Sequence, residues 1–440
     1  MGKQKLLFKE YVEKNKKRNF IFFAIYQFTF RIGWLFKTES IIVPSAARML
    51  GASNFIIGMF PMISSLGETI PPMFIVNWVK HFPRKKPYLL IFSFLSPLFW
   101  FLIFLSFFLL SSGNKKTLLW CFITFYILFY FSQGAVQVLT IIIKGKVIPY
   151  NIRGRLISLS GTLGGISSII LTFFIVRPVL NNGVLNPLTP YTILFLLSSV
   201  FFFFSWMSNF GIKEPPLESQ EKNSKALLPF IKESIAIVKK DRDFILFFFV
   251  GGTTMCGYSL LQFYTVYAKT HLQVSNYMLT YYLIVQVSAS SIGSLFLGHL
   301  ADKYGNRLVL RIIAMLLVLT PLSAVTIGTW VDLPFRQWLY CIVYFMVGFG
   351  LPVIQTLINY LLEISPLEKH PNYISIYNTF SCVFIIFPLI IGLLMDHFYY
   401  NKVFLGISIF MVIGIVLSQK LVEPRHLLDG SEYQEEVPLG

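Results

Sequence analysis

Four side chains in the segment 20–46 have a spacing that places them on one face of a helix. Gln27, Arg31, Trp34 and Thr38 stand at i, i+4, i+7 and i+11 in an otherwise apolar run. A guanidinium group is costly to place in lipid, so this face should look onto a cavity inside the protein. We therefore name Gln27, Arg31 and Trp34 as candidate contacts for a bound solute, with Arg31 binding an anionic or hydroxyl group.

An acidic residue lies at a similar depth in the next apolar segment, 55–79. Arg31 is about eleven residues from the start of its segment and Glu68 about eleven from the end of the next, roughly 16 Å deep at helical rise. Two interpretations stay open: a fixed ion pair, or solute binding by Arg31 while Glu68 carries a proton. Glu39 is the second candidate proton carrier. Lys37 is predicted to be solvated or to snorkel toward the membrane surface.

Uncharged polar residues recur in pairs, four positions apart, in four other apolar segments. Because side chains at i and i+4 share a helix face, each pair forms a polar stripe. Amide and phenol groups on facing helices can hydrogen-bond a neutral or zwitterionic solute, and they can equally bond to one another and hold helices together. The pairs are Gln133 with Gln137, Tyr258 with Gln262, Tyr282 with Gln286, and Gln355 with Asn359.

The composition requires helices that span a membrane. Of the 440 residues, 55% are hydrophobic and 13% are charged, which is more apolar surface than one soluble core can bury. The apolar runs are long enough to cross a bilayer at about 1.5 Å per residue. We predict an all-α polytopic membrane protein with twelve transmembrane helices, at approximately 20–46, 55–79, 87–111, 117–143, 154–177, 189–211, 244–268, 276–300, 308–329, 336–362, 373–397 and 402–421.

The basic residues indicate the orientation. The termini and the even-numbered connectors contain 28 Lys and Arg residues, against seven in the odd-numbered connectors. Both termini are therefore predicted to be cytoplasmic, in a chain that lies in the cell membrane. The net charge of +17 belongs to these connectors and does not indicate nucleic-acid binding. The four cysteines lie in apolar segments without paired spacing, and no metal-ligand pattern, nucleotide loop or catalytic triad appears, so we expect no cofactor, no metal and no enzymatic activity.

The two halves of the chain repeat with an offset of 222 residues. The motif LGAS at 50–53 recurs as LQVS at 272–275, and Gln133 and Gln137 recur as Gln355 and Asn359. Internal repeats of this length are typical of transporters built from two similar bundles.

The repeat and the connectors predict the domain organisation. We expect two pseudo-symmetric six-helix bundles, 1–211 and 244–440, the second ending in a short acidic tail. The connector 212–243 opens with a polar stretch and continues with helical apolar spacing. That pattern predicts a linker followed by an amphipathic helix on the cytoplasmic membrane surface.

The connector 298–307, GHLADKYGNR, concentrates glycine and charge between two apolar segments. Gly298 and Gly305 permit close helix approach and a sharp turn, Asp302 can accept hydrogen bonds from a helix N-terminus, and Arg307 adds positive charge. The pattern resembles the loop signature of the major facilitator superfamily, G-x-x-x-D-[RK]-x-G-x-[RK]. RMLGAS, VIPYNIRGR, KEPP and LLEISPLEK at other connectors also look like landmarks of this family.

The resemblance implies a secondary active transporter whose two bundles expose a midplane site alternately to the two sides of the membrane. Its partners would be a small organic solute, the lipid bilayer and, for coupling, a proton or solute gradient; we expect a monomer. Asp302, Arg307 and Glu363, with Gly298 and Gly305, are assigned to gating at the cytoplasmic side. The alternative is a non-transporting membrane sensor or receptor built on the same fold.

Overall fold

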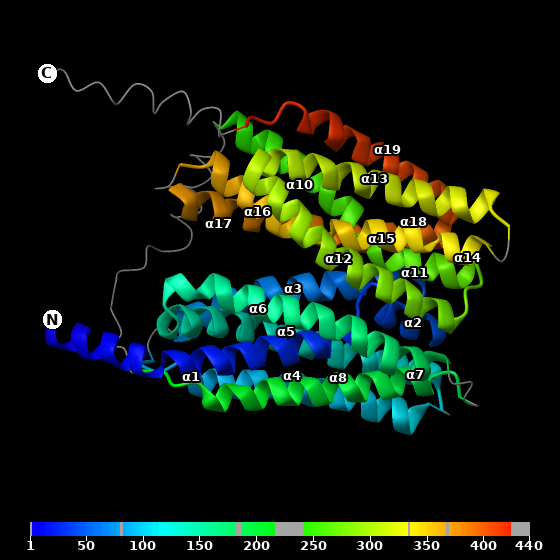
Figure 1. Ribbon diagram of the computed structural model, residues 1–440. Helices are drawn as coiled ribbons and strands as arrows, with labels where there is room; N and C mark the ends of the chain where they lie inside the picture. Colours follow the sequence, from blue (N-terminus) through cyan, green and yellow to red (C-terminus); the bar gives the residue numbers. More distant parts are fainter. Residues whose placement is uncertain are drawn as a thin grey trace, which may run out of the picture. The chain divides into compact units, whose positions relative to one another are not determined.

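The helices of the chain fall into two compact units in the computed structural model (Figure 1). The structure describes residues 2–79, 82–111, 113–181, 186–215, 241–332, 335–366 and 369–423, and every element in these ranges is helical. One unit comprises Met1–Lys222 with Ser275–Thr280, and the other Asn223–Val274 with Tyr281–Gly440. The predicted surface helix and the acidic tail lie outside the described residues.

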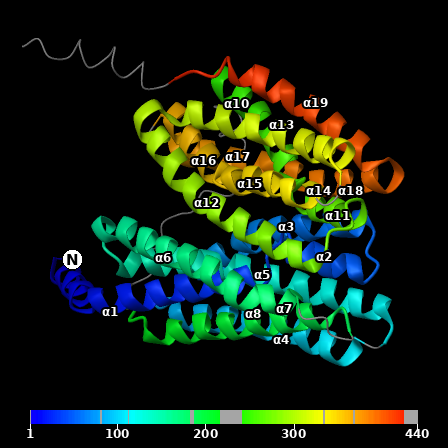
Figure 2. The same ribbon diagram turned by 45° about the vertical axis from the view of Figure 1, so that its right-hand side comes forward.

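Long helices pack around an aromatic core in the first unit. α4 packs against α5 and α8, α5 also packs on α3, and α1 packs on α6 and α8; α1, α4 and α8 lie side by side in both views (Figure 2). Trp100 and Phe122 each lie within 5.5 Å of Phe195 between ring centroids, and all three are fully buried. The elements are α1 (Gly2–Leu35), α2 (Ile42–Met49), α3 (Asn54–Val79), α4 (Lys86–Leu110), α5 (Lys115–Val147), α6 (Tyr150–Leu171), η1 (Thr172–Val176), α7 (Arg177–Asn181), α8 (Thr189–Ser208) and η2 (Asn209–Gly211).

Several predicted spans of the second unit are interrupted. The seventh breaks between α10 and α11, and the tenth breaks between α15 and α16, where Pro352 lacks the amide that would continue the helix. α13 packs against α19 and α15, and α10 packs against α19. The elements are α10 (Arg242–Tyr258), α11 (Leu261–Thr270), α12 (Asn276–Tyr304), α13 (Asn306–Trp330), α14 (Phe335–Leu339), α15 (Cys341–Gly350), α16 (Val353–Ile364), α17 (His370–Ser381), η4 (Cys382–Ile386), α18 (Phe387–His397) and α19 (Tyr400–Ser418).

Ten helices in the described part of the chain are long and apolar enough to cross a membrane. α1 and α3, of 34 and 26 residues, are not among them. α1 carries Arg31 and a charged start, which lower its mean hydropathy, and α3 carries Glu68 and three prolines. The count of twelve spans and the cytoplasmic location of the termini stay predictions.

The first predicted span, 20–46, is wrong as a single helix. α1 ends at Leu35 and α2 begins at Ile42. Between them the Thr38 carbonyl accepts hydrogen bonds from the amides of Ile41, Ile42 and Val43, which closes a tight turn. Lys37 and Glu39 therefore lie in a turn between two helices, where their side chains can point to other elements.

A residue with a positive φ stands at the same position of the repeated motif in both halves. Gly51 has φ +86° and its counterpart Gln273 has φ +49°. A positive φ is uncommon for a residue other than glycine, so its presence at both positions is a feature that the two halves share. Leu50 and Leu272, which precede the two positions, are both buried. The offset of 222 residues thus corresponds to a structural repeat at this point.

Candidate functional site

The polar face of α1 contacts α6. Arg31 Nη1 donates a hydrogen bond of 2.9 Å to the carbonyl oxygen of Gly161, and Gln27 Oε1 accepts one of 2.7 Å from the Ser160 hydroxyl. A Cβ at Gly164 would lie 2.5 Å from Arg31 Cδ, so this glycine makes room for the arginine stem. Arg31 is nevertheless exposed. Its remaining N–H groups can bind a carboxylate or phosphate in the bidentate geometry that guanidinium favours.

The ion pair between Arg31 and Glu68, one of the two sequence interpretations, is wrong. Within the described residues no salt bridge joins them, and the Arg31 guanidinium is directed to α6. The charges that act on Glu68 are those of Glu39 and Lys37. Glu68 is exposed on the surface of α3.

Lys37 is fully buried, and the prediction of a solvated or snorkelling side chain is wrong. Its Nζ lies 2.5 Å from Glu39 Oε1 and 2.7 Å from the Tyr130 hydroxyl. The ammonium also lies 3.2 Å from the centre of the Trp34 ring and 4.9 Å from that of Phe129. Aromatic faces attract cations, so the Trp34 ring, proposed as a solute contact, already has a cation on one face.

Two glycines bring α3 and α5 together at the level of this cluster. A Cβ at Gly67 would lie 2.5 Å from Tyr130 Cβ, and one at Gly134 would overlap the Gly67 carbonyl oxygen. Close backbone approach at small residues therefore places Glu68, the next residue, beside the Lys37 cluster. Sequence reasoning missed Gly67 and Gly134, although glycines inside two apolar helices were the signal that could have found them.

The amide pair on α5 is split between two environments. Gln133 is buried, and its Nε2 donates to the Ser96 hydroxyl on α4 at 2.5 Å. This is the interhelical alternative for Gln133, and its role as a solute contact stays a prediction. Gln137, one turn further along, is exposed. Gln133 therefore contacts α4, whereas Gln137, one helical turn later, has an accessible side chain.

The amides of the second unit differ in exposure as well. Gln355 Nε2 donates to Asn359 Oδ1 at 2.9 Å, and this bond is exposed. Gln262 is buried and donates to the Ser259 carbonyl at the break between α10 and α11. Gln286 is buried on α12, and Tyr258 is partly buried at the end of α10. The amide of Gln355 on α16 is therefore accessible, whereas that of Gln262 is not.

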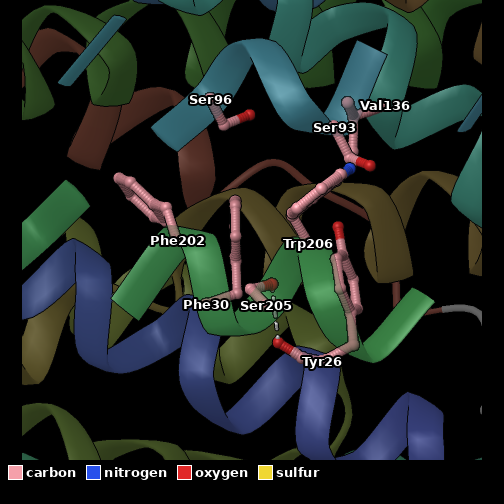
Figure 3. Close-up of a pocket in the computed structure, with 8 residues that line it drawn as sticks. All are labelled: Tyr26, Phe30, Ser93, Ser96, Val136, Phe202, Ser205 and Trp206. Atoms are coloured by element: carbon pink, nitrogen blue, oxygen red, sulfur yellow. Dashed lines mark hydrogen bonds between the residues drawn. The ribbon is translucent and has the colours of Figure 1, made fainter. Parts of the chain in front are cut away.

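A small internal cavity lies among α1, α4, α5 and α8 of the first unit (Figure 3). Its volume of about 10 Å³ is close to the minimum for one water molecule and far below that of an organic solute. The Ser205 hydroxyl beside it donates to the Tyr26 carbonyl. The cavity is lined by Tyr26, Phe30, Ser93, Ser96, Val136, Phe202, Ser205 and Trp206. It is a packing defect of the bundle interior and not the solute site.

The loop 298–307 is held by an acid that sequence reasoning did not name. Arg307 Nε lies 3.2 Å from Glu423 Oε2, and Glu363 Oε1 accepts from the Asn306 amide at 2.6 Å. The charges of Glu423, Arg307 and Glu363 all act on Tyr360, whereas Asp302 is exposed at the end of α12. The predicted gating residues Arg307 and Glu363 thus lie in one cluster, with Glu423 as a further member.

Glu214 makes similar contacts in the first unit, at the end that corresponds to the Glu423 cluster of the second unit. Its carboxylate accepts hydrogen bonds from the backbone amides of Lys85 at 2.8 Å and Lys86 at 2.7 Å, and it pairs with Lys146 Nζ at 2.8 Å. The amides belong to the start of α4, where a negative charge is stabilised by unpaired N–H groups and the helix dipole. Burial and nearby Lys146 lower the pKa of the Lys85 ammonium, while Glu214 opposes this effect. Glu214 and Glu423 each precede a proline after the last helix of their unit.

The two glycines of the loop have different roles. Nothing described lies within 4 Å of a Cβ built at Gly298, and its predicted role in gating stays a prediction. Gly293, one turn and a half earlier, instead lies against Phe349. Gly305 has φ +86° and ψ 158°, a conformation that is almost restricted to glycine, and a Cβ there would collide with the Glu423 carboxylate.

Replacing Gly305 with alanine is expected to destabilise the protein by about 2 kcal/mol, because the new residue is strained and displaces Glu423. Thermal unfolding of the purified protein measures this loss. Gly51→Ala is the matched control, since Gly51 also has φ +86° but has open space at the Cβ position. Equal losses in the two variants would show that the contact with Glu423 carries no stability.

The comparisons with known proteins agree with this architecture. The profile of the Major Facilitator Superfamily matches residues 20–384 and, separately, 289–437. No curated protein matches the chain.

Three solved structures illustrate the similarity in fold. A variant of the nucleoside transporter NupG has a TM-score of 0.67 at 12% identity, over 93% of this chain and 100% of that chain. A D-xylose-proton symporter has a TM-score of 0.65 at 14% identity, over 94% and 98%. The inward-open xylose transporter XylE from E. coli has a TM-score of 0.63 at 13% identity, over 91% and 96%. Because the family profile covers most of the residues in both helical units, the chain belongs to the Major Facilitator Superfamily and is a multi-pass membrane transporter, not an enzyme.

Proposed function

We propose that this transporter moves a small organic solute with an anionic group across the cell membrane, coupled to a proton. The observation that carries the solute class is the exposed Arg31 guanidinium, held in place by a single bond to Gly161. Gln27 beside it and the exposed Gln137 supply uncharged hydrogen-bonding groups in the first unit. The exposed Gln355 and the partly buried Asn359 offer amides in the second.

Glu68 is proposed as the proton carrier, with Glu39 second. The Glu68 carboxylate is exposed and makes no hydrogen bond to the described residues, so it can take up a proton without breaking an existing contact. Glu39, in contrast, is bonded to Lys37. A solved structure with the same fold is that of a D-xylose-proton symporter, which supports proton coupling here.

The gating proposal concerns the end of each unit that is predicted to be cytoplasmic. Asp302, Arg307 and Glu363, with Gly305 at the turn, would change partners as the site opens to one side or the other. The Arg307–Glu423 pair supports this role because it ties the loop to the chain that follows α19. We further propose that both termini are cytoplasmic and that the two six-helix domains are 1–211 and 244–440.

A ligand panel tests the proposal. Small organic carboxylates and phosphates, each paired with a neutral analogue, are screened for thermal stabilisation of the purified protein, and each hit is followed into proteoliposomes with and without a proton gradient. We expect an anion to bind more tightly than its neutral analogue and to accumulate when the gradient is applied. A ligand that binds but does not cross would support the sensor alternative. A preference for neutral analogues would contradict the anionic class.

Glu68→Gln is expected to abolish accumulation driven by the proton gradient. One pH unit supplies about 1.4 kcal/mol per coupled proton, which supports roughly tenfold accumulation. Without the titrating carboxylate the ratio should fall to about one, while exchange of labelled for unlabelled solute continues. Glu13→Gln is the control, because Glu13 is an exposed acid on α1. Tenfold accumulation by Glu68→Gln would exclude Glu68 as the carrier.

A further inference from the structure

The proposed transport does not involve one buried cation of the first unit, Lys37. Lys37 has an exposed fraction of 0% and lies in the turn after α1. A buried ammonium is costly unless its charge and all its N–H groups are compensated. Here Glu39 accepts one hydrogen bond, the Tyr130 hydroxyl accepts a second, and the Trp34 ring lies against the ammonium at 3.2 Å. Specific partners therefore compensate the Lys37 ammonium at this position.

The cluster contains more negative than positive charge. Glu39 and Glu68 are two acids beside one ammonium, and the charges of both Lys37 and Glu39 act on Glu68. The other groups that face them are the phenols of Tyr126 and Tyr130 from α5, with the buried Trp100 from α4. Arg31 is turned to α6 and does not compensate this charge. One cation is thus shared by two carboxylates, and a bound proton would balance the charge.

The two carboxylates are not equivalent. Protonating Glu39 would remove the charge that holds the buried ammonium 2.5 Å away and leave Lys37 without its counter-ion. Protonating Glu68 breaks no hydrogen bond within the described residues and reduces its repulsion with Glu39. The geometry therefore distinguishes a structural carboxylate from one that can exchange its proton.

We infer that Lys37 is a positioning residue for coupling: its ammonium holds the Glu39 carboxylate in an ion pair and so leaves Glu68 as the carboxylate that takes up the transported proton. The proton forms an O–H bond on Glu68 and leaves from the same oxygen, and Lys37 keeps its own protons throughout. The inference rests on the proposed proton coupling and deepens it, because it explains why a second acid nearby does not carry a second proton.

The test compares single and double neutral variants. Lys37→Gln leaves two carboxylates without a cation, and we expect the roughly tenfold accumulation per pH unit to be lost. Lys37→Gln combined with Glu39→Gln restores the native net charge of the cluster, and we expect the double variant to recover most of the accumulation. Glu39→Gln alone should retain coupling. Lys402→Gln, at a lysine exposed on α19, is the matched control.

A second measurement needs no transported solute. Infrared difference spectra of the purified proteins, recorded across pH, report the carboxyl groups that titrate. We expect one cluster signal in the native protein, absent from Glu68→Gln and present in Glu39→Gln. Lys37→Gln should add a second signal, which Glu39→Gln removes in the double variant. Thermal unfolding of each variant identifies any that fail to fold.

The outcomes separate this inference from the proposed function. If solute uptake by the native protein does not depend on the proton gradient, the proposed coupling is wrong, whatever the infrared spectra show. The inference is tested only when coupling is present in the native protein and lost in Glu68→Gln. It is overturned if the double variant accumulates no more solute than Lys37→Gln and if the spectra of Lys37→Gln match the native ones. Lys37 would then only fill space.

Discussion

Arg31→Ala is expected to weaken binding of the anionic solute by about 2 kcal/mol or more, roughly a thirtyfold increase in Kd. The guanidinium is held by Gly161 and by the space at Gly164, so a bound anion meets an oriented cation. Removing it leaves the anion without its counter-charge. Solute-induced thermal stabilisation and equilibrium binding to purified protein measure the change, and the neutral analogue of the solute should lose far less.

Arg48→Ala is the matched control for this variant. Arg48 also donates from Nη1 to a backbone carbonyl, that of Ala52, at 2.9 Å, but it lies at the end of α2, outside the proposed site. Its loss should leave binding unchanged. Arg31→Lys should recover only part of the affinity, because a lysine cannot form the bidentate contact. Native affinity in Arg31→Ala would remove Arg31 from the site.

Glu214→Gln is expected to destabilise the first unit by about 3 kcal/mol. The carboxylate is buried, accepts two backbone amides at the start of α4 and pairs with Lys146, which is itself mostly buried. An amide of the same shape cannot neutralise Lys146 and has one acceptor oxygen in place of two. A fall of several degrees in the Tm of the purified protein would show the effect.

The size of this effect depends on burial, and a second acid in the same unit tests that. Glu13 forms an ion pair with Lys16 one helical turn away, but its side chain is 66% exposed. Exposed pairs of this kind contribute little, so Glu13→Gln should leave the Tm unchanged. An unchanged Tm in Glu214→Gln as well would mean that water replaces the carboxylate at the start of α4.

Local patterns in the sequence were sufficient to predict several features of the structure. Length and hydropathy predict an all-α membrane protein, and ten helices meet that criterion in the described part of the chain. The repeat at an offset of 222 residues has a positive φ in both copies, at Gly51 and at Gln273. The spacing of Gln27 and Arg31 correctly placed both on one face, because helical periodicity is a property of neighbouring residues.

The partners of those residues were decided only by the tertiary structure. Arg31 binds α6, and Lys37 turns inward to Glu39 and Tyr130, because the end of α1 at Leu35 and the close contact of Gly67 with α5 set which side chains meet. Gln133 and Gln355 are repeat-related, yet one is buried against Ser96 and the other is exposed. Periodicity specifies a face, but the helix that covers the face depends on crossing geometry, which contacts distant in sequence determine.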